Sequence, residues 1–252
     1  DYAKDTLWNK TVLLLKSKGG EIGSKPTLHH AAFTGDIKIL EKLTSKVYNI
    51  EQRDDWHLPP RNWTPLHYAA RAGKDKAVAL LVKYKANVNL KDSKEITPLH
   101  SASSGGHAKA VSVLIENGAD WNITCGERKE PALFAAVNKN RANVVNILIS
   151  NGADVNAKDA FAETALDSAV SKGLPEMVAL LVSKGANVNG NGGTSPLHKA
   201  ASTGKKEIVE ILLANKANIN ISIAFGDTPL DWAIRNNHSD IIKILKQNGG
   251  KT

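Results

Sequence analysis

Residues 64–73 read TPLHYAARAG, and this stretch decides the fold because near-copies of it recur along the chain. Its first four letters return as TPLH at 97–100, as SPLH at 195–198 and as TPLD at 228–231, and weaker copies begin at Pro26, Pro131 and Thr164. Successive copies start 38, 33, 34, 33, 31 and 33 residues apart. Seven copies at a period near 33 residues predict a chain built from stacked structural repeats.

Each copy has the sequence pattern of a short helix. Thr64 can cap the helix through its hydroxyl, and Pro65 suits the first helical position, where its missing N–H costs nothing. Leu66 and Ala69 are three residues apart and share one apolar face. Gly73, which recurs or is replaced by Asn in the other copies, is expected to end the helix in a left-handed conformation.

A second apolar helix follows each first one, as in residues 78–82 and 178–182. It is expected to stop at a glycine, except where Lys85 and Lys216 take that place and predict local backbone strain. An Ala-Asp/Asn-X-Asn segment then leads through a turn-rich connection into the next copy.

This pattern resembles the ankyrin repeat family, since helix caps, alanine face, glycine stops and Ala-Asp-X-Asn segments recur in phase over nearly the whole chain. The resemblance implies an all-α repeat solenoid of ankyrin-type helix-turn-helix units with β-hairpin-like fingers. We expect one ankyrin repeat domain over 1–252, with about seven repeats starting near 26, 64, 97, 131, 164, 195 and 228. Residues 1–25 are expected to form an N-terminal half-repeat cap.

Composition narrows the class of protein. The chain has 252 residues, of which 42% are hydrophobic and 23% charged, and this balance argues against a disordered chain. No apolar run approaches the length of a membrane span, so none is expected. Cys125 is the only cysteine, which fits a reducing compartment and favours the cytoplasm. Because the chain begins at Asp1, export after removal of an N-terminal segment is the alternative.

The formal charge of +8 is spread along the chain with a mild bias to the first hundred residues. Lysine outnumbers arginine 27 to 6, although arginine is the usual reader of phosphates and base edges. Nucleic acid is therefore the weaker interpretation, and a slightly basic surface is the stronger one. We expect a monomer that binds another protein, with an acidic partner favoured and no small-molecule substrate.

The histidines are better explained by the repeat than by chemistry. His29, His67, His100 and His198 occupy one repeat position, and in an ankyrin-like unit such side chains hydrogen-bond neighbouring loops. Equivalent histidines of consecutive repeats lie too far apart to share a zinc ion. With no phosphate loop or nucleophile motif present, we expect no enzyme activity, no catalytic residues, no cofactor and no metal.

The connection from Glu51 to Trp63 is the most irregular part of the repeat and predicts a long finger. Its tryptophans and arginines are residue types enriched at binding hot spots, so it and the exposed inner-helix positions are the expected partner surface. The alternative is that Trp56 and Trp63 fold onto the insertion and bury it. The candidate partner-binding residues are His30, Phe33, Trp56, His57, Arg61, Trp63, Tyr68, Arg71, Phe161, Lys199, Phe225, Trp232 and Arg235.

The leading hypothesis is a non-enzymatic protein-binding module that uses its concave face and long finger. A narrower version is an inhibitor or immunity protein that blocks an enzyme with the finger from Trp56 to Trp63. A third is a targeting arm of a larger effector or toxin whose catalytic part lies elsewhere.

Overall fold

The computed structural model describes residues 27–46, 49–54, 61–190, 193–223 and 226–252. The expected N-terminal half-repeat cap at 1–25 lies outside these residues. The described parts form seven consecutive helix pairs, which confirms the expected repeat count. The pairs are α2 (Leu28–Thr34) and α3 (Ile37–Thr44), α4 (Pro65–Arg71) and α5 (Asp75–Lys83), α6 (Pro98–Gly105) and α7 (Ala108–Glu116), α8 (Ala132–Asn138) and α9 (Ala142–Ser150), α10 (Ala165–Lys172) and α11 (Pro175–Ser183), α12 (Pro196–Ser202) and α13 (Lys206–Ala214), and α14 (Pro229–Arg235) and α15 (Ser239–Gln247).

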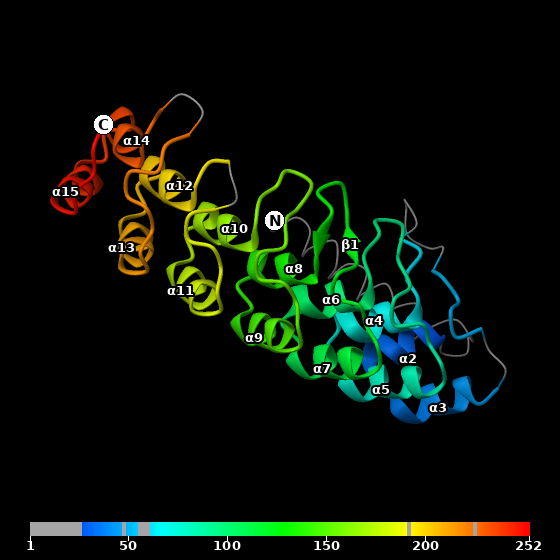
Figure 1. Ribbon diagram of the computed structural model, residues 1–252. Helices are drawn as coiled ribbons and strands as arrows, with labels where there is room; N and C mark the ends of the chain where they lie inside the picture. Colours follow the sequence, from blue (N-terminus) through cyan, green and yellow to red (C-terminus); the bar gives the residue numbers. More distant parts are fainter. Residues whose placement is uncertain (1–26, 47–48, 55–60, 191–192, 224–225) are drawn as a thin grey trace.

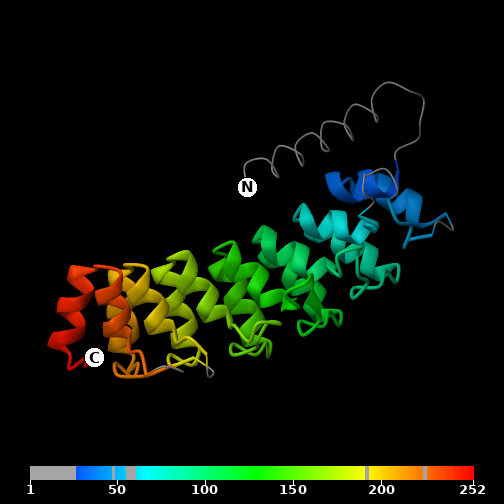
Figure 2. The same cartoon turned by 90° about the horizontal axis from the view of Figure 1, so that it is seen from above.

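The pairs stack side by side into an elongated, curved solenoid, as expected (Figures 1 and 2). The first helices of the pairs form an inner row, the second helices form an outer row, and the connecting fingers project beyond the inner row (Figure 1). One apolar core runs along the stack, with Leu66, Leu99, Leu133, Leu166 and Leu197 buried at equivalent inner-helix positions. Within the part of the chain that the structure describes, no helix is long and apolar enough to cross a membrane.

Side-chain caps start the inner helices, as the repeated threonines predict. In α10, the Oγ1 atom of Thr164 accepts a hydrogen bond from the backbone N–H of Asp167 at 3.3 Å. The Asp167 carboxylate in turn accepts the backbone N–H of Thr164 at 2.9 Å. This reciprocal pair satisfies two N–H groups that the helix leaves without partners.

Left-handed residues end the inner helices, which confirms the reading of the repeated glycines. The backbone φ angle of Gly106 after α6 is 81°, and that of Asn140 after α8 is 54°. At the ends of outer helices, Lys85 and Lys216 have φ angles of 70° and 65°, so the expected strain at these two lysines is present.

Adjacent fingers are joined by backbone hydrogen bonds rather than by a continuous sheet. The N–H of Ser93 donates to the carbonyl of Arg61 at 3.0 Å, and the N–H of Ala160 donates to the carbonyl of Arg128 at 2.7 Å. In the third repeat the finger contains a short antiparallel pair, β1 (Thr124–Cys125) with β2 (Glu130–Pro131). These bonds fix each finger relative to its neighbour and so position the side chains described below.

Candidate functional site

The described ends of the long finger meet at Asp54 and Trp63, and Trp63 is only 3% exposed. Its backbone N–H donates to the Asp54 carboxylate at 2.8 Å, and its indole N–H donates to the Asp92 carboxylate of the next finger at 2.8 Å. The indole ring also meets the Tyr68 ring edge-on, with centroids 5.1 Å apart. Trp63 is therefore part of the packing between two fingers.

Tyr68 is fully buried beneath the same finger. Its hydroxyl donates to the Asp54 carboxylate, and Phe33 packs edge-on against its ring at 6.4 Å. Trp63 and Tyr68 were expected to present aromatic surface to a partner, but both are buried, because each donates a hydrogen bond to a buried carboxylate. For Trp63 the alternative, that it packs onto the insertion, is the one that the structure supports.

The other N-terminal candidates lie around this buried cluster. Arg61 is exposed, with its guanidinium carbon 5.2 Å from the centre of the Trp63 ring. Arg71 is half-buried and donates to the Ser104 hydroxyl at 3.4 Å, and His30 and Phe33 are half-buried on α2. Three candidates lie outside the described residues, namely Trp56, His57 and Phe225.

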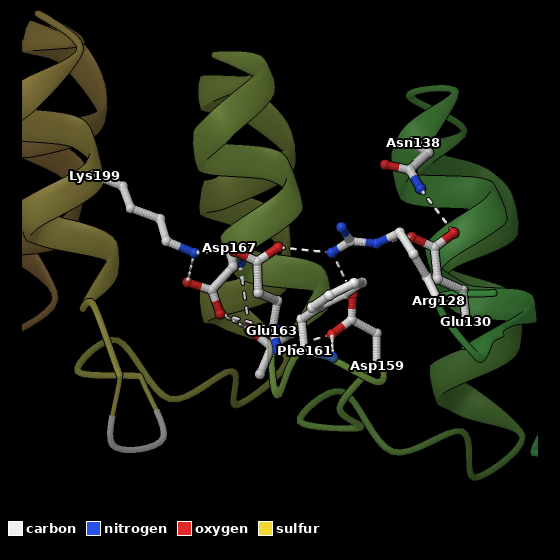
Figure 3. Close-up of polar contacts among 9 residues, drawn as sticks. Arg128, Glu130, Asn138, Asp159, Phe161, Glu163, Asp167 and Lys199 are labelled. Atoms are coloured by element: carbon white, nitrogen blue, oxygen red, sulfur yellow. Dashed lines mark hydrogen bonds and ion pairs between the residues drawn. The ribbon is translucent and has the colours of Figure 1, made fainter.

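In the central repeats, Arg128 organises a row of charged side chains between neighbouring fingers (Figure 3). Its guanidinium contacts the buried Asp159 carboxylate, the Glu163 carboxylate at 2.8 Å and the Glu130 carboxylate at 3.2 Å. It also lies over the ring of Phe161, 4.7 Å from the ring centre. Phe161 is 66% exposed, so this fingertip presents an aromatic side chain to solvent.

Lys199 continues this row from α12, on the far side of Asp167 (Figure 3). Its ammonium lies 2.8 Å from the Glu163 carboxylate and 2.9 Å from the Asp167 carboxylate. The hydrogen bond from Lys199 is the largest of the effects that lower the pKa of Glu163. Lys199 was expected on the exposed inner-helix surface, but its side chain is only 17% exposed because it joins two repeats.

An open hollow of about 510 Å³ lies beside this row, over the exposed side of α8 and α10. Arg128, Glu130 and Glu163 line it on the finger side. Small polar side chains also line it, together with two lysines at the ends of the inner helices. These residues are Asn138, Ser168, Ser171, Lys139 and Lys172.

The C-terminal candidates form a separate group on α14. Arg235 pairs with the Asp227 carboxylate at 2.6 Å and remains 62% exposed. Trp232 is half-buried and meets the ring of His198 edge-on at 5.3 Å. The structure thus divides the sequence-predicted residues among the two ends and the centre of the stack instead of joining them in one patch.

The histidines hold neighbouring fingers, as the resemblance implied. Burial, the largest effect, lowers the pKa of His67 and His100 to about 4, so both rings are neutral at pH 7. The Nε2 atoms of His67, His100 and His198 lie 3.0, 3.2 and 3.0 Å from the carbonyl oxygens of Ile96, Glu130 and Asp227.

Cys125 is half-buried in the finger of the third repeat. Burial, followed by nearby carboxylates, raises the pKa of Cys125 to about 11, which keeps the thiol protonated at neutral pH. Among the described residues, no group of three or more His, Cys, Asp and Glu side chains is placed to hold a metal ion.

Sequence reasoning missed the centre of the charged row, since it named only Phe161 and Lys199 there. The spacing of the aspartates could have indicated this row, because Asp92 and Asp159 each lie five residues before a helix-capping threonine and so occupy the same finger position. A buried acid at a recurring finger position needs a donor from the preceding finger, and Arg128 supplies one.

Comparison with known proteins agrees with this architecture. The family model described as "Ankyrin repeats (3 copies)" matches residues 28–125, 124–192 and 188–252. The human ASB11 ankyrin repeat domain is 25% identical, with a TM-score of 0.75, and the match covers 90% of this chain and 100% of that one. The ankyrin repeat domain of Bcl-3, described as a unique member of the IkappaB protein family, is 27% identical, with a TM-score of 0.76 and coverage of 88% and 100%. Because the family matches extend over most of the sequence, this chain belongs to the ankyrin repeat family.

Proposed function

We propose that this chain is a non-enzymatic module that binds a protein partner across the exposed side of its inner helices and its fingertips. The hollow over α8 and α10 is the principal contact in this proposal. The observation that carries it is the hollow itself, an open recess of about 510 Å³ near a fingertip where Phe161 is 66% exposed. A protruding aromatic side chain beside a recess is typical of a binding hot spot.

Family membership supports a protein as the partner. Ankyrin repeat domains generally mediate protein–protein interactions and are typically non-enzymatic. The stack explains why, since side chains on the exposed inner face can change without altering the buried leucines and alanines of the core. The protonated thiol of Cys125 and the neutral, hydrogen-bonded His67 and His100 favour the same reading.

An inhibitory role through the long finger remains a second, untested prediction. Burial of Trp63 removes one of its two tryptophans from the accessible surface, so this role has less support than binding at the central hollow.

Filling the hollow tests the proposal. Ser171 is exposed and occupies the repeat position that holds Phe33 in the first repeat, so the fold has room for a large side chain there. We expect Ser171→Phe to abolish capture of the wild-type chain's protein partners while leaving the melting temperature unchanged. Ser150→Phe, on the outer helix α9, is the matched control and should capture them fully. Full capture by Ser171→Phe would contradict the proposal.

A further inference from the structure

Two lysines that have no ion-pair partner among the described residues line one side of the hollow. Lys139 and Lys172 occupy the same place in consecutive repeats, immediately before Asn140 and Gly173, the left-handed residues that end the two inner helices. Both side chains are exposed, and neither forms an ion pair or a hydrogen bond with any residue in the described ranges. An anionic group that enters the hollow from this side would therefore meet two available ammonium groups.

The same edge of the solenoid carries further cations in adjacent repeats. The side chains of Lys74 and Arg141 rest on Gly35 and Gly106, where an added Cβ would come within 2.9 and 2.7 Å of them. Lys205 also lies against the glycine of its preceding repeat, but there the nearest atom is the ammonium nitrogen, 3.0 Å from an added Cβ of Gly173. Glycine at the first two places makes room for the aliphatic stems of Lys74 and Arg141.

His107 lies on this edge, close to several of its cations. Its Nε2–H donates a 3.0 Å hydrogen bond to the carbonyl of Arg71. Burial, the largest effect, lowers the pKa of His107, and this hydrogen bond raises it in part. The charged groups that lower the pKa further are Arg71, Arg141 and Lys74, all of them cations. Three cations therefore lie close enough to this ring to disfavour its protonated form.

The carboxylates on the finger side of the hollow already have partners, so they are poorly available to bind a cation. Asp159 and Asp167 are buried and hold backbone N–H groups, while Glu163 is already shared between Arg128 and Lys199. Glu130, the other carboxylate that lines the hollow, pairs with the Arg128 guanidinium at 3.2 Å. Among the described residues, the charged side chains of the lining that form no ion pair are therefore Lys139 and Lys172. An acidic group is the complement that this arrangement favours.

We propose that the hollow binds an extended acidic segment of a protein partner, with the carboxylates of the segment paired to Lys139 and Lys172. The hydroxyls of Ser168 and Ser171 and the amide of Asn138 also line the hollow and can form hydrogen bonds with the backbone of such a segment. This inference rests on the proposed function and adds the chemistry of the ligand to it.

A displayed library of short random peptides, selected on the immobilised full chain, tests this proposal. We expect the selected peptides to be enriched in Asp and Glu relative to the unselected library. Their Kd should rise about five-fold in the double variant Lys139→Gln, Lys172→Gln, because two exposed ion pairs are lost. The double variant Lys76→Gln, Lys109→Gln removes the same charge from the outer helices α5 and α7, and it should leave the Kd unchanged.

Each contrary outcome has a distinct meaning. An equal loss of affinity in the Lys76, Lys109 control would overturn the proposal, because the binding would then be unspecific attraction to a basic protein. Peptides without acidic enrichment that are lost in Ser171→Phe would overturn the acidic ligand and leave the proposed function standing. Failure to select any peptide that Ser171→Phe weakens would overturn both.

Discussion

The N-terminal and central fingers each bury an aspartate, and a different type of side chain donates to it in each region. In both regions a buried aspartate closes the fingertip: Asp92 Oδ1 accepts the backbone N–H of Ile96 at 2.8 Å, and Asp159 Oδ1 accepts that of Glu163 at 2.9 Å. The second carboxylate oxygen of each aspartate must then find a donor on the preceding finger, because an unpaired buried acceptor is costly.

Trp63 supplies that donor at the N-terminal end, and Arg128 supplies it in the centre. Trp63 is 3% exposed, whereas the Arg128 side chain is 43% exposed and holds Phe161 and Glu163 at the surface. We call the contact between two neighbouring fingers at such an aspartate a joint. The joint at Trp63 is closed, because its donor is buried, whereas the joint at Arg128 is open, because its donor is half-exposed and a partner can reach it. Trp63 and Tyr68 are therefore packing residues, and the surface that we propose for recognition lies where the side chains of the inner helices are small.

The largest effect is expected for Trp63→Ala. It removes a buried aromatic side chain and leaves the Asp92 carboxylate without its donor, so the free energy of unfolding should fall by about 3–5 kcal/mol. Urea titration followed by circular dichroism measures this loss. Trp63→Phe keeps much of the ring volume and should cost less, roughly 1–3 kcal/mol. A urea midpoint that is unchanged in Trp63→Ala would contradict the packing role and indicate that Trp63 is an exposed anchor.

Acidification should weaken the N-terminal repeats next. The unfolded chain binds a proton at each histidine near pH 6.5, whereas folded His67 and His100 bind one only near pH 4, so stability falls as the pH drops through this window. The loss approaches about 3 kcal/mol for each ring at the low end. Amide hydrogen exchange at descending pH should show α4 and α6 opening first. Uniform exchange along the stack would contradict the assignment of the loss to these two rings.

Arg128→Met should have a smaller effect on stability. The methionine keeps the aliphatic stem but leaves Asp159 without its charged donor, which costs about 1–2 kcal/mol because water can enter this half-exposed joint. Thermal unfolding of this variant beside Trp63→Ala measures the difference between the two joints directly. A cost equal to or above that of Trp63→Ala would mean that the central joint is as closed as the N-terminal one.

Phe161→Ala should leave stability within about 0.5 kcal/mol of wild type, since the side chain is largely in solvent. Its effect should appear in binding instead, as a loss on the order of 2 kcal/mol in affinity for the partner. Paired calorimetry and melting curves separate the two readouts. A marked drop in melting temperature would place Phe161 with Trp63 among the packing residues.

Much of the fold follows from the period alone. Capping at Thr164, the left-handed backbone at Gly106 and the strain at Lys85 all depend on residues close in sequence, so local chemistry predicts them. The period then places each unit against the next, which is enough to predict the stack.

The site was predicted less well because side chains at the fingers depend on the neighbouring repeat. Trp63 looks like an exposed anchor until Asp92, 29 residues later, is placed beside it. Arg128 looks like an ordinary surface charge until Asp159, 31 residues later, is known to be buried beneath it. Composition identifies the residue types that favour binding, but burial decides which of them are accessible.

Hydrogen–deuterium exchange of the full chain, with and without a peptide selected on it, tests the contrast between the two regions most directly. The account predicts slower exchange on binding in residues 158–173, which include the central fingertip and α10. It predicts no change in residues 61–73, where Trp63 and Tyr68 are already buried. Protection of residues 61–73 with no change in 158–173 would contradict it.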